Sequence, residues 1–139
     1  MACAVCAVLL AAPVQGQTAA DIGQPTLNYY GLPGLVDMPT AQVMPDAELA
    51  VTAAFFDGSF RGTLAFQATP RLTLTFRYAG IEDFGVEDVR LDRSFDIHWQ
   101  VLRESDWLPA VAVGIRDIAG TGIFSSEYIV ATRHFGAED

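Results

Sequence analysis

Three polar residues, Asp96, His98 and Gln100, occupy every second position of one short stretch. The carboxylate of the first and the imidazole of the second are groups that could act together in catalysis or in metal binding. In an extended chain, residues two apart point to the same side, so the three side chains would share one face. A carboxylate beside an imidazole can act as a base or bind a metal. No third ligand or nucleophile has the spacing of a zinc site or a catalytic triad. We therefore interpret the group as a polar cluster that pairs with Arg77 or Arg116.

Other residues of reactive type lack the context that their chemistry needs. Ser125 and Ser126 follow a glycine-rich stretch without a nucleophile-elbow motif. Gly120–Gly122 lacks the rest of a phosphate-binding loop, and His134 is a lone histidine at the predicted end of a strand. We expect no enzyme activity, no cofactor and no metal.

Six amphipathic runs are expected to position these polar residues. In the third run Leu72, Leu74 and Phe76 alternate with Thr73 and Thr75, the period of a strand with one apolar face. The runs cover residues 48–56, 60–68, 71–80, 94–101, 110–117 and 127–135. Their less apolar faces define a row predicted to face the lumen of a barrel: Arg61, Gln67, Arg77, Asp96, His98, Gln100, Arg116 and Arg133.

The connections alternate between short turns and longer loops. The connections at residues 68–71 and 104–109 are short, whereas those at 80–92 and 117–126 are longer and polar or glycine-rich. Successive runs can therefore pair as antiparallel hairpins in an up-and-down meander. The first long loop carries five acidic residues predicted to face the exterior: Glu82, Asp83, Glu87, Asp88 and Asp92.

The region before the strands divides into two parts. Residues 1–20 have the short apolar run and following small residues of a secretory signal peptide, and they contain Cys3 and Cys6. Residues 21–46 form an irregular lead-in rich in proline and glycine, with one helical turn expected at 40–43. Residues 47–139 form the six-strand meander.

Composition excludes one large class of partners. The chain has 139 residues, a formal net charge of −9, and eight basic residues, all of them arginine. An acidic chain without clustered cations is not expected to bind nucleic acid. It is 51% hydrophobic and only 18% charged, with a mean hydropathy of +0.28, which is apolar for a soluble domain.

The apolar faces fit two architectures, an outer-membrane β-barrel and a soluble β-sandwich. The runs approach the length of a tilted transmembrane strand, and the opposite faces mix small and single polar residues, which favours the barrel. Six strands are fewer than the eight of the smallest single-chain barrels, so we expect an incomplete barrel belonging to a longer protein. The alternative is a soluble periplasmic β-sandwich that binds carbohydrate or a partner protein.

One segment resembles a known family. The stretch Gly31–Ala41, followed by Met44–Asp46 and the first strand, is similar to the N-terminal region of the YjbH-like exopolysaccharide-biosynthesis outer-membrane proteins. Residues 92–136 continue the resemblance. It implies a β-barrel in the bacterial outer membrane, in contact with lipid, that serves exopolysaccharide biosynthesis or secretion. The expected partners are the exopolysaccharide and other secretion proteins.

Overall fold

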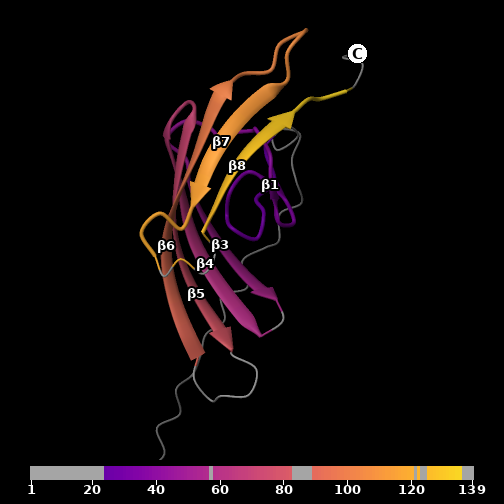
Figure 1. Cartoon of the computed structure of the whole chain (residues 1–139). Helices are drawn as coiled ribbons and strands as arrows, with labels where there is room; N and C mark the ends of the chain where they lie inside the picture. The colour runs from indigo at the N-terminus through magenta and orange to yellow at the C-terminus, as the bar shows by residue number, and fades with distance from the viewer. Residues whose placement is uncertain (1–23, 57, 83–88, 121, 123–124, 136–139) are drawn as a thin grey trace, which may run out of the picture.

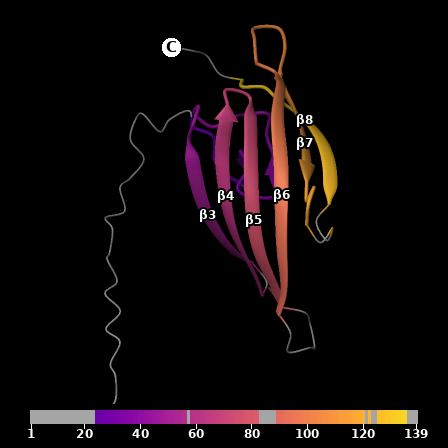
Figure 2. The same cartoon turned by 90° about the vertical axis from the view of Figure 1, so that its left-hand side faces the viewer.

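The regular structure of this protein is all β-strand. The computed structural model describes residues 24–56, 58–82, 89–120, 122 and 125–135. Six strands form one antiparallel sheet in chain order (Figure 2), and, before it in the chain, two short strands pair as a hairpin. The elements are β1 (Gly34–Leu35), β2 (Met38–Pro39), β3 (Leu49–Phe56), β4 (Ser59–Thr69), β5 (Leu72–Glu82), β6 (Val89–Leu102), β7 (Ala110–Arg116) and β8 (Ser126–Thr132).

The predicted all-β, up-and-down meander is confirmed, with each of the six runs present as a strand. The described residues contain no helix that could cross a membrane. The predicted signal peptide, residues 1–20, lies outside the described residues.

A segment before the sheet covers one of its faces. This inner segment (residues 24–48) lies on the concave side, and the sheet curls around it (Figure 1). Leu32 and Ala41 are fully buried there. The expected helical turn at 40–43 is wrong: the Thr40 amide donates to Pro33 O and the Ala41 amide to the Thr132 hydroxyl. Those partners replace the local hydrogen bonds of a helix.

Two strands are longer than the sequence predicted. β5 continues to Glu82 and β6 begins at Val89, and these two residues pair with each other. Residues 80–82 and 89–92 of the expected loop are therefore strand, and residues 83–88, which include Asp83, Glu87 and Asp88, lie outside the described residues. Asp92 is fully buried within β6, which corrects its assignment to an exterior loop. The reason is that the hairpin ladder runs on past the end of the apolar alternation.

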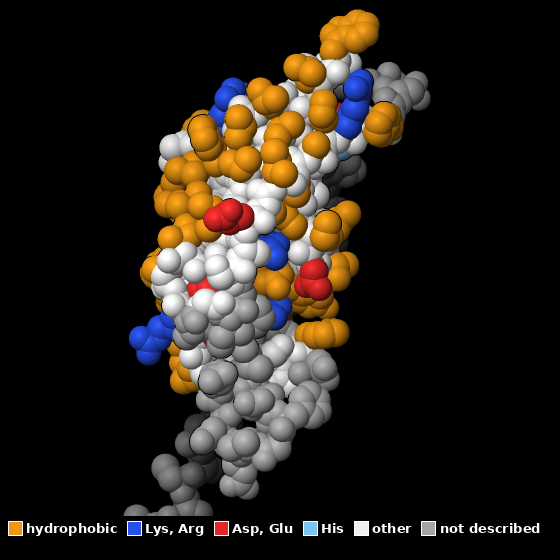
Figure 3. Space-filling model, in the orientation of Figure 1, with side chains coloured by type: hydrophobic (Ala, Val, Ile, Leu, Met, Phe, Trp, Pro, Cys, Tyr) orange, Lys and Arg blue, Asp and Glu red, His pale blue; other side chains and the backbone are white. Residues whose placement is uncertain are grey.

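The polarity of the two faces of the sheet is the reverse of that in a water-soluble protein. The face toward the inner segment, the covered face, is mostly polar and buried, and the outer face is apolar and exposed. Exposed apolar side chains spread over the region of β6, β7 and β8, with few charges between them (Figure 3). The exposed large apolar residues of the outer face are Leu49, Val51, Phe55, Phe60, Leu64, Phe66, Leu74, Leu91, Phe95, Ile97, Trp99, Ile115 and Ile129.

Candidate functional site

The covered face gathers most of the predicted polar row beneath the inner segment. Gln67, Arg77, Asp96, His98 and Gln100 are all buried there. They come from β4, β5 and β6, and the strand pleat aims every second side chain at the same face. Thr63, Thr73, Thr75, Asp92 and Ser94 extend the polar surface, and small residues, Ala65, Ala79, Ala110 and Ala112, leave room for the segment.

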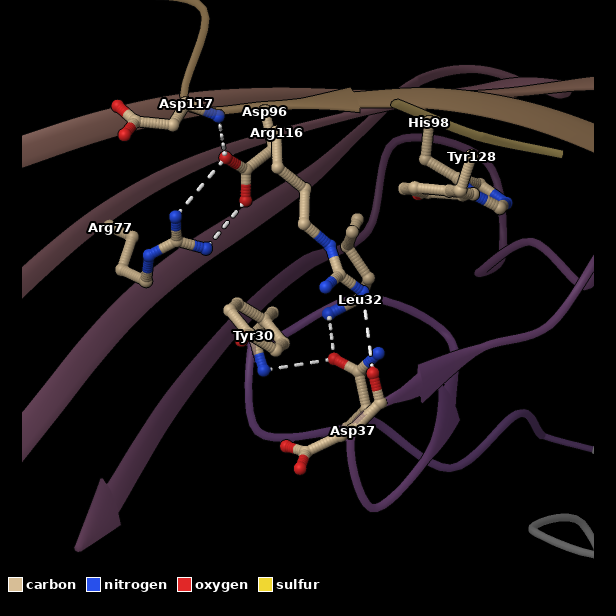
Figure 4. Close-up of polar contacts among 10 residues, drawn as sticks. Tyr30, Leu32, Asp37, Arg77, Asp96, His98, Arg116, Asp117 and Tyr128 are labelled. Carbon is tan, nitrogen blue, oxygen red and sulfur yellow. Dashed lines mark hydrogen bonds and ion pairs between the residues drawn. The ribbon is translucent and has the colours of Figure 1, made fainter. Parts of the chain in front are cut away.

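A buried ion pair lies at the centre of this face. Arg77 donates from Nη1 to Asp96 Oδ2 at 2.8 Å and from Nη2 to Asp96 Oδ1 at 3.4 Å (Figure 4). Both side chains are 0% exposed. Asp96 Oδ1 also accepts the Asp117 amide at 2.8 Å, so the carboxylate joins β5 to the end of β7. Two-point geometry and the extra donor are what a buried pair requires to offset its desolvation.

One tyrosine of the inner segment stands among three arginines of the sheet. The guanidinium carbons of Arg61, Arg77 and Arg116 lie 4.9, 5.0 and 4.0 Å from the centre of the Tyr30 ring. An aromatic face attracts cations at such distances. Asn28 holds the ring in place, because its side-chain oxygen accepts the Tyr30 amide at 2.9 Å within a tight turn.

β6 binds the backbone of the inner segment through two side chains. Gln100 donates from Nε2 to Ala41 O at 2.7 Å. His98 Nε2 lies 3.1 Å from Gln42 O, and because a carbonyl only accepts, this nitrogen is the donor. In the neutral ring His98 Nδ1 then accepts the Tyr128 hydroxyl at 3.0 Å. Two members of the predicted polar cluster, His98 and Gln100, thus bind the backbone of the inner segment.

Three further strands contribute contacts of the same kind. Gln67 Oε1 of β4 accepts the Met44 amide at 3.2 Å, and Arg116 of β7 donates to Asp37 O at 3.3 Å. Thr132 of β8 accepts the Ala41 amide through its hydroxyl at 2.9 Å. The inner segment therefore crosses the strands from β8 to β4 and is recognised through its main chain.

Arg133 departs from the predicted row. It is exposed just beyond β8, where it donates to Asp106 O at 2.8 Å instead of joining the cluster. The reason is parity: odd-numbered residues of β8 face outward, and Tyr128 and Val130 face inward.

A second, exposed polar group lies at the β6–β7 turn. His134 donates its Nδ1 hydrogen to Glu104 Oε2 at 2.6 Å and its amide to Glu104 Oε1 at 2.7 Å. These two hydrogen bonds, the side-chain bond first, hold the pKa of the Glu104 carboxyl below its ordinary value. Gln42 Nε2 lies 3.1 Å from His134 Nε2, which connects the inner segment to the same group.

The covered face is built to bind a chain. The side-chain amides of Gln67 and Gln100, the His98 imidazole and the Thr132 hydroxyl are engaged with backbone groups of the inner segment. No cluster of three or more acidic, histidine or cysteine side chains suited to a metal occurs among the described residues.

Sequence reasoning missed the partner of the polar row. The lead-in appeared irregular because its proline and glycine residues serve turns, as at Gly31, where φ is +75° and an added Cβ would overlap Thr63. Tyr30, the only aromatic in this segment to contact three arginines of the described sheet, gave no periodic signal.

Comparison with known proteins identifies the family. Residues 26–139 match the profile described as "Exopolysaccharide biosynthesis protein YbjH". The chain is also 36% identical over 128 residues to the "Uncharacterized lipoprotein YjbH" of Escherichia coli K12. It belongs to the YjbH exopolysaccharide biosynthesis family. The matched region covers 86% of this chain but 18% of that relative, so the chain spans about a fifth of the relative's length. No solved structure matches.

Proposed function

We propose that this YjbH-family chain forms part of the wall of an outer-membrane β-barrel that serves exopolysaccharide biosynthesis or secretion without catalysing a reaction. The observation that carries the proposal is the inverted sheet, apolar outside and polar beneath the inner segment. Lipid-facing barrels have this polarity, and water-soluble sheets have the opposite one. The Escherichia coli relative is named a lipoprotein, which is consistent with an exported envelope protein.

The size of the apolar face fits a bilayer. In β6 the outward positions run from Leu91 to Val101, ten residues apart. At about 3.4 Å per residue this is a path of roughly 34 Å, which a tilt of about 40° reduces to a height of roughly 26 Å. The apolar band of outer-membrane barrels is about 25 Å tall.

Aromatic residues stand near both ends of the strands. Phe55 and Phe60 flank the β3–β4 turn with ring centres 5.0 Å apart, and Trp107 is 87% exposed in the β6–β7 turn at the opposite end. Barrels place aromatic girdles at both membrane interfaces. Arg93, the cation on the outer face of β6, has a long side chain that can extend toward the headgroups.

The sheet edges require further strands. Within the described residues β3 and β8 each pair with one strand, and lipid does not tolerate open edges. We propose that other strands of the longer protein complete the barrel. In the soluble β-sandwich alternative a second sheet would instead cover the outer face, and the protein would bind carbohydrate or a partner protein in the periplasm.

Spin-label accessibility tests the proposal in the full-length protein, otherwise free of cysteine and reconstituted in phospholipid vesicles. Labels at outer positions (Phe95→Cys, Ile97→Cys) should collide more with oxygen, which dissolves in lipid, than with a water-soluble nickel chelate. Labels at the covered positions Ser94→Cys and Thr75→Cys are the matched controls and should be shielded from both probes. A sandwich would remain in the aqueous phase, with the outer positions also shielded from both probes.

A genetic test addresses the family role. Loss of the gene should lower the amount of secreted exopolysaccharide.

A further inference from the structure

Five side chains of the sheet share one property, which is that their hydrogen bonds to the inner segment go to its main chain. Gln67, His98, Gln100, Arg116 and Thr132 donate to three carbonyls and accept from two amides of the segment. They come from four strands, so they form a strip across the sheet. Such a strip presents donors and acceptors without selecting side chains.

Apolar burial in this contact comes from the segment, where Leu32 and Met44 are buried, and little of it comes from the sheet. The buried apolar side chains of the sheet at the interface are alanines, Ala65, Ala79, Ala110 and Ala112, and Ala41 packs on the last two from the segment. Hydrophobic burial scales with apolar area, so alanines give little of it. The sheet side of the contact is therefore polar or alanine, and another molecule that supplies equivalent hydrogen-bonding groups can replace the segment there.

We propose that the covered face is a binding surface for a hydroxyl-rich glycan strand, and that the inner segment occupies this surface until the glycan displaces it. The inference rests on the proposed function. A sugar hydroxyl both donates and accepts, as the backbone amides and carbonyls do together, so it can satisfy the same side chains. The Arg77–Asp96 pair joins β5 to β6 and stays in place when the segment leaves.

A disulfide between the segment and β8 tests whether displacement is required. The Ala41 amide nitrogen lies 2.9 Å from Thr132 Oγ1, so these two residues are in direct contact. Ala41→Cys/Thr132→Cys in the full-length protein should therefore cross-link in the oxidising periplasm. We expect cells carrying the cross-linked protein to secrete several-fold less polysaccharide and to recover when a thiol reductant is added.

The matched control is a cross-link that leaves the segment free. Val113 and Ile129 are register partners in β7 and β8 on the outer face, away from the segment. Val113→Cys/Ile129→Cys should form a disulfide within the sheet and leave secretion unchanged.

Normal secretion by fully cross-linked protein would overturn the inference, because the segment would then cover this face permanently. The proposed function would survive that result if the spin labels still reported lipid on the outer face. A second measurement covers the case in which the double variant fails to assemble. In purified Ala41→Cys protein, polysaccharide isolated from the same cells should speed thiol labelling at position 41. An unchanged labelling rate would also refute displacement.

Discussion

Breaking the buried Arg77–Asp96 pair should destabilise the protein strongly. The two side chains are fully buried and joined at two points, with the shorter distance 2.8 Å. Arg77→Met would leave the Asp96 carboxylate buried with the Asp117 amide and no cation. Removing one partner of a buried pair typically costs about 3–5 kcal/mol. We expect Arg77→Met to fall in that range, including the loss of its contact with the Tyr30 ring.

A double-mutant cycle separates the pair from its surroundings. Asp96→Asn keeps an oxygen for the Asp117 amide but removes the carboxylate charge that faces the buried Arg77 guanidinium, so it should also cost about 3 kcal/mol. The double variant should cost less than the sum of the singles by about 2 kcal/mol or more. Equilibrium urea unfolding of the full-length protein in detergent micelles, followed by tryptophan fluorescence, measures the four free energies.

The control is an arginine on the other face of the same strand pair. Arg93 is exposed on β6, with its guanidinium carbon 6.0 Å from the centre of the Tyr78 ring. Arg93→Met should cost less than about 1 kcal/mol, because exposed cation–aromatic contacts are weak. Equal costs for Arg77→Met and Arg93→Met, or additive effects in the cycle, would refute a buried, coupled ion pair.

Two further predictions concern packing and pH. An added Cβ at Gly114 would overlap the Tyr128 ring, so Gly114→Ala should lower the free energy of unfolding by about 1–3 kcal/mol. Gly62→Ala is the control, because a Cβ there meets ordinary contact distances and should be tolerated. The thermal unfolding midpoints of the two variants measure the difference. The lowered pKa of Glu104 contributes stability above its ordinary value of 4.5, which is lost as the pH falls through the lower folded value. Thermal unfolding midpoints measured from pH 6 down to pH 3 should therefore fall further for the wild-type protein than for Glu104→Gln. If the midpoints of the two proteins fall in parallel with pH, the contact between Glu104 and His134 does not form.

The sequence by itself determined the strands and which side chains share a face. Strict alternation in β5 and β6 predicted that Thr75, Arg77, Asp96 and His98 lie opposite the apolar residues, because the side-chain period of a strand is two. Pairing between successive strands followed from the short connections. Arg93 interrupts the apolar alternation of β6 at an outward position while the ladder continues past it, which is why the position of Asp92 was predicted wrongly.

Only the tertiary structure decided what the polar face touches. Contacts such as Gln100 to Ala41 O join residues 59 apart in the chain and use backbone atoms, which carry no residue-specific signal. The turn around Asn28 and the position of Tyr30 among three arginines depend equally on the sheet being curled around them. A segment without periodicity therefore became the partner of the polar row, because its backbone supplies hydrogen-bonding partners to the buried side chains of Gln67, His98 and Gln100.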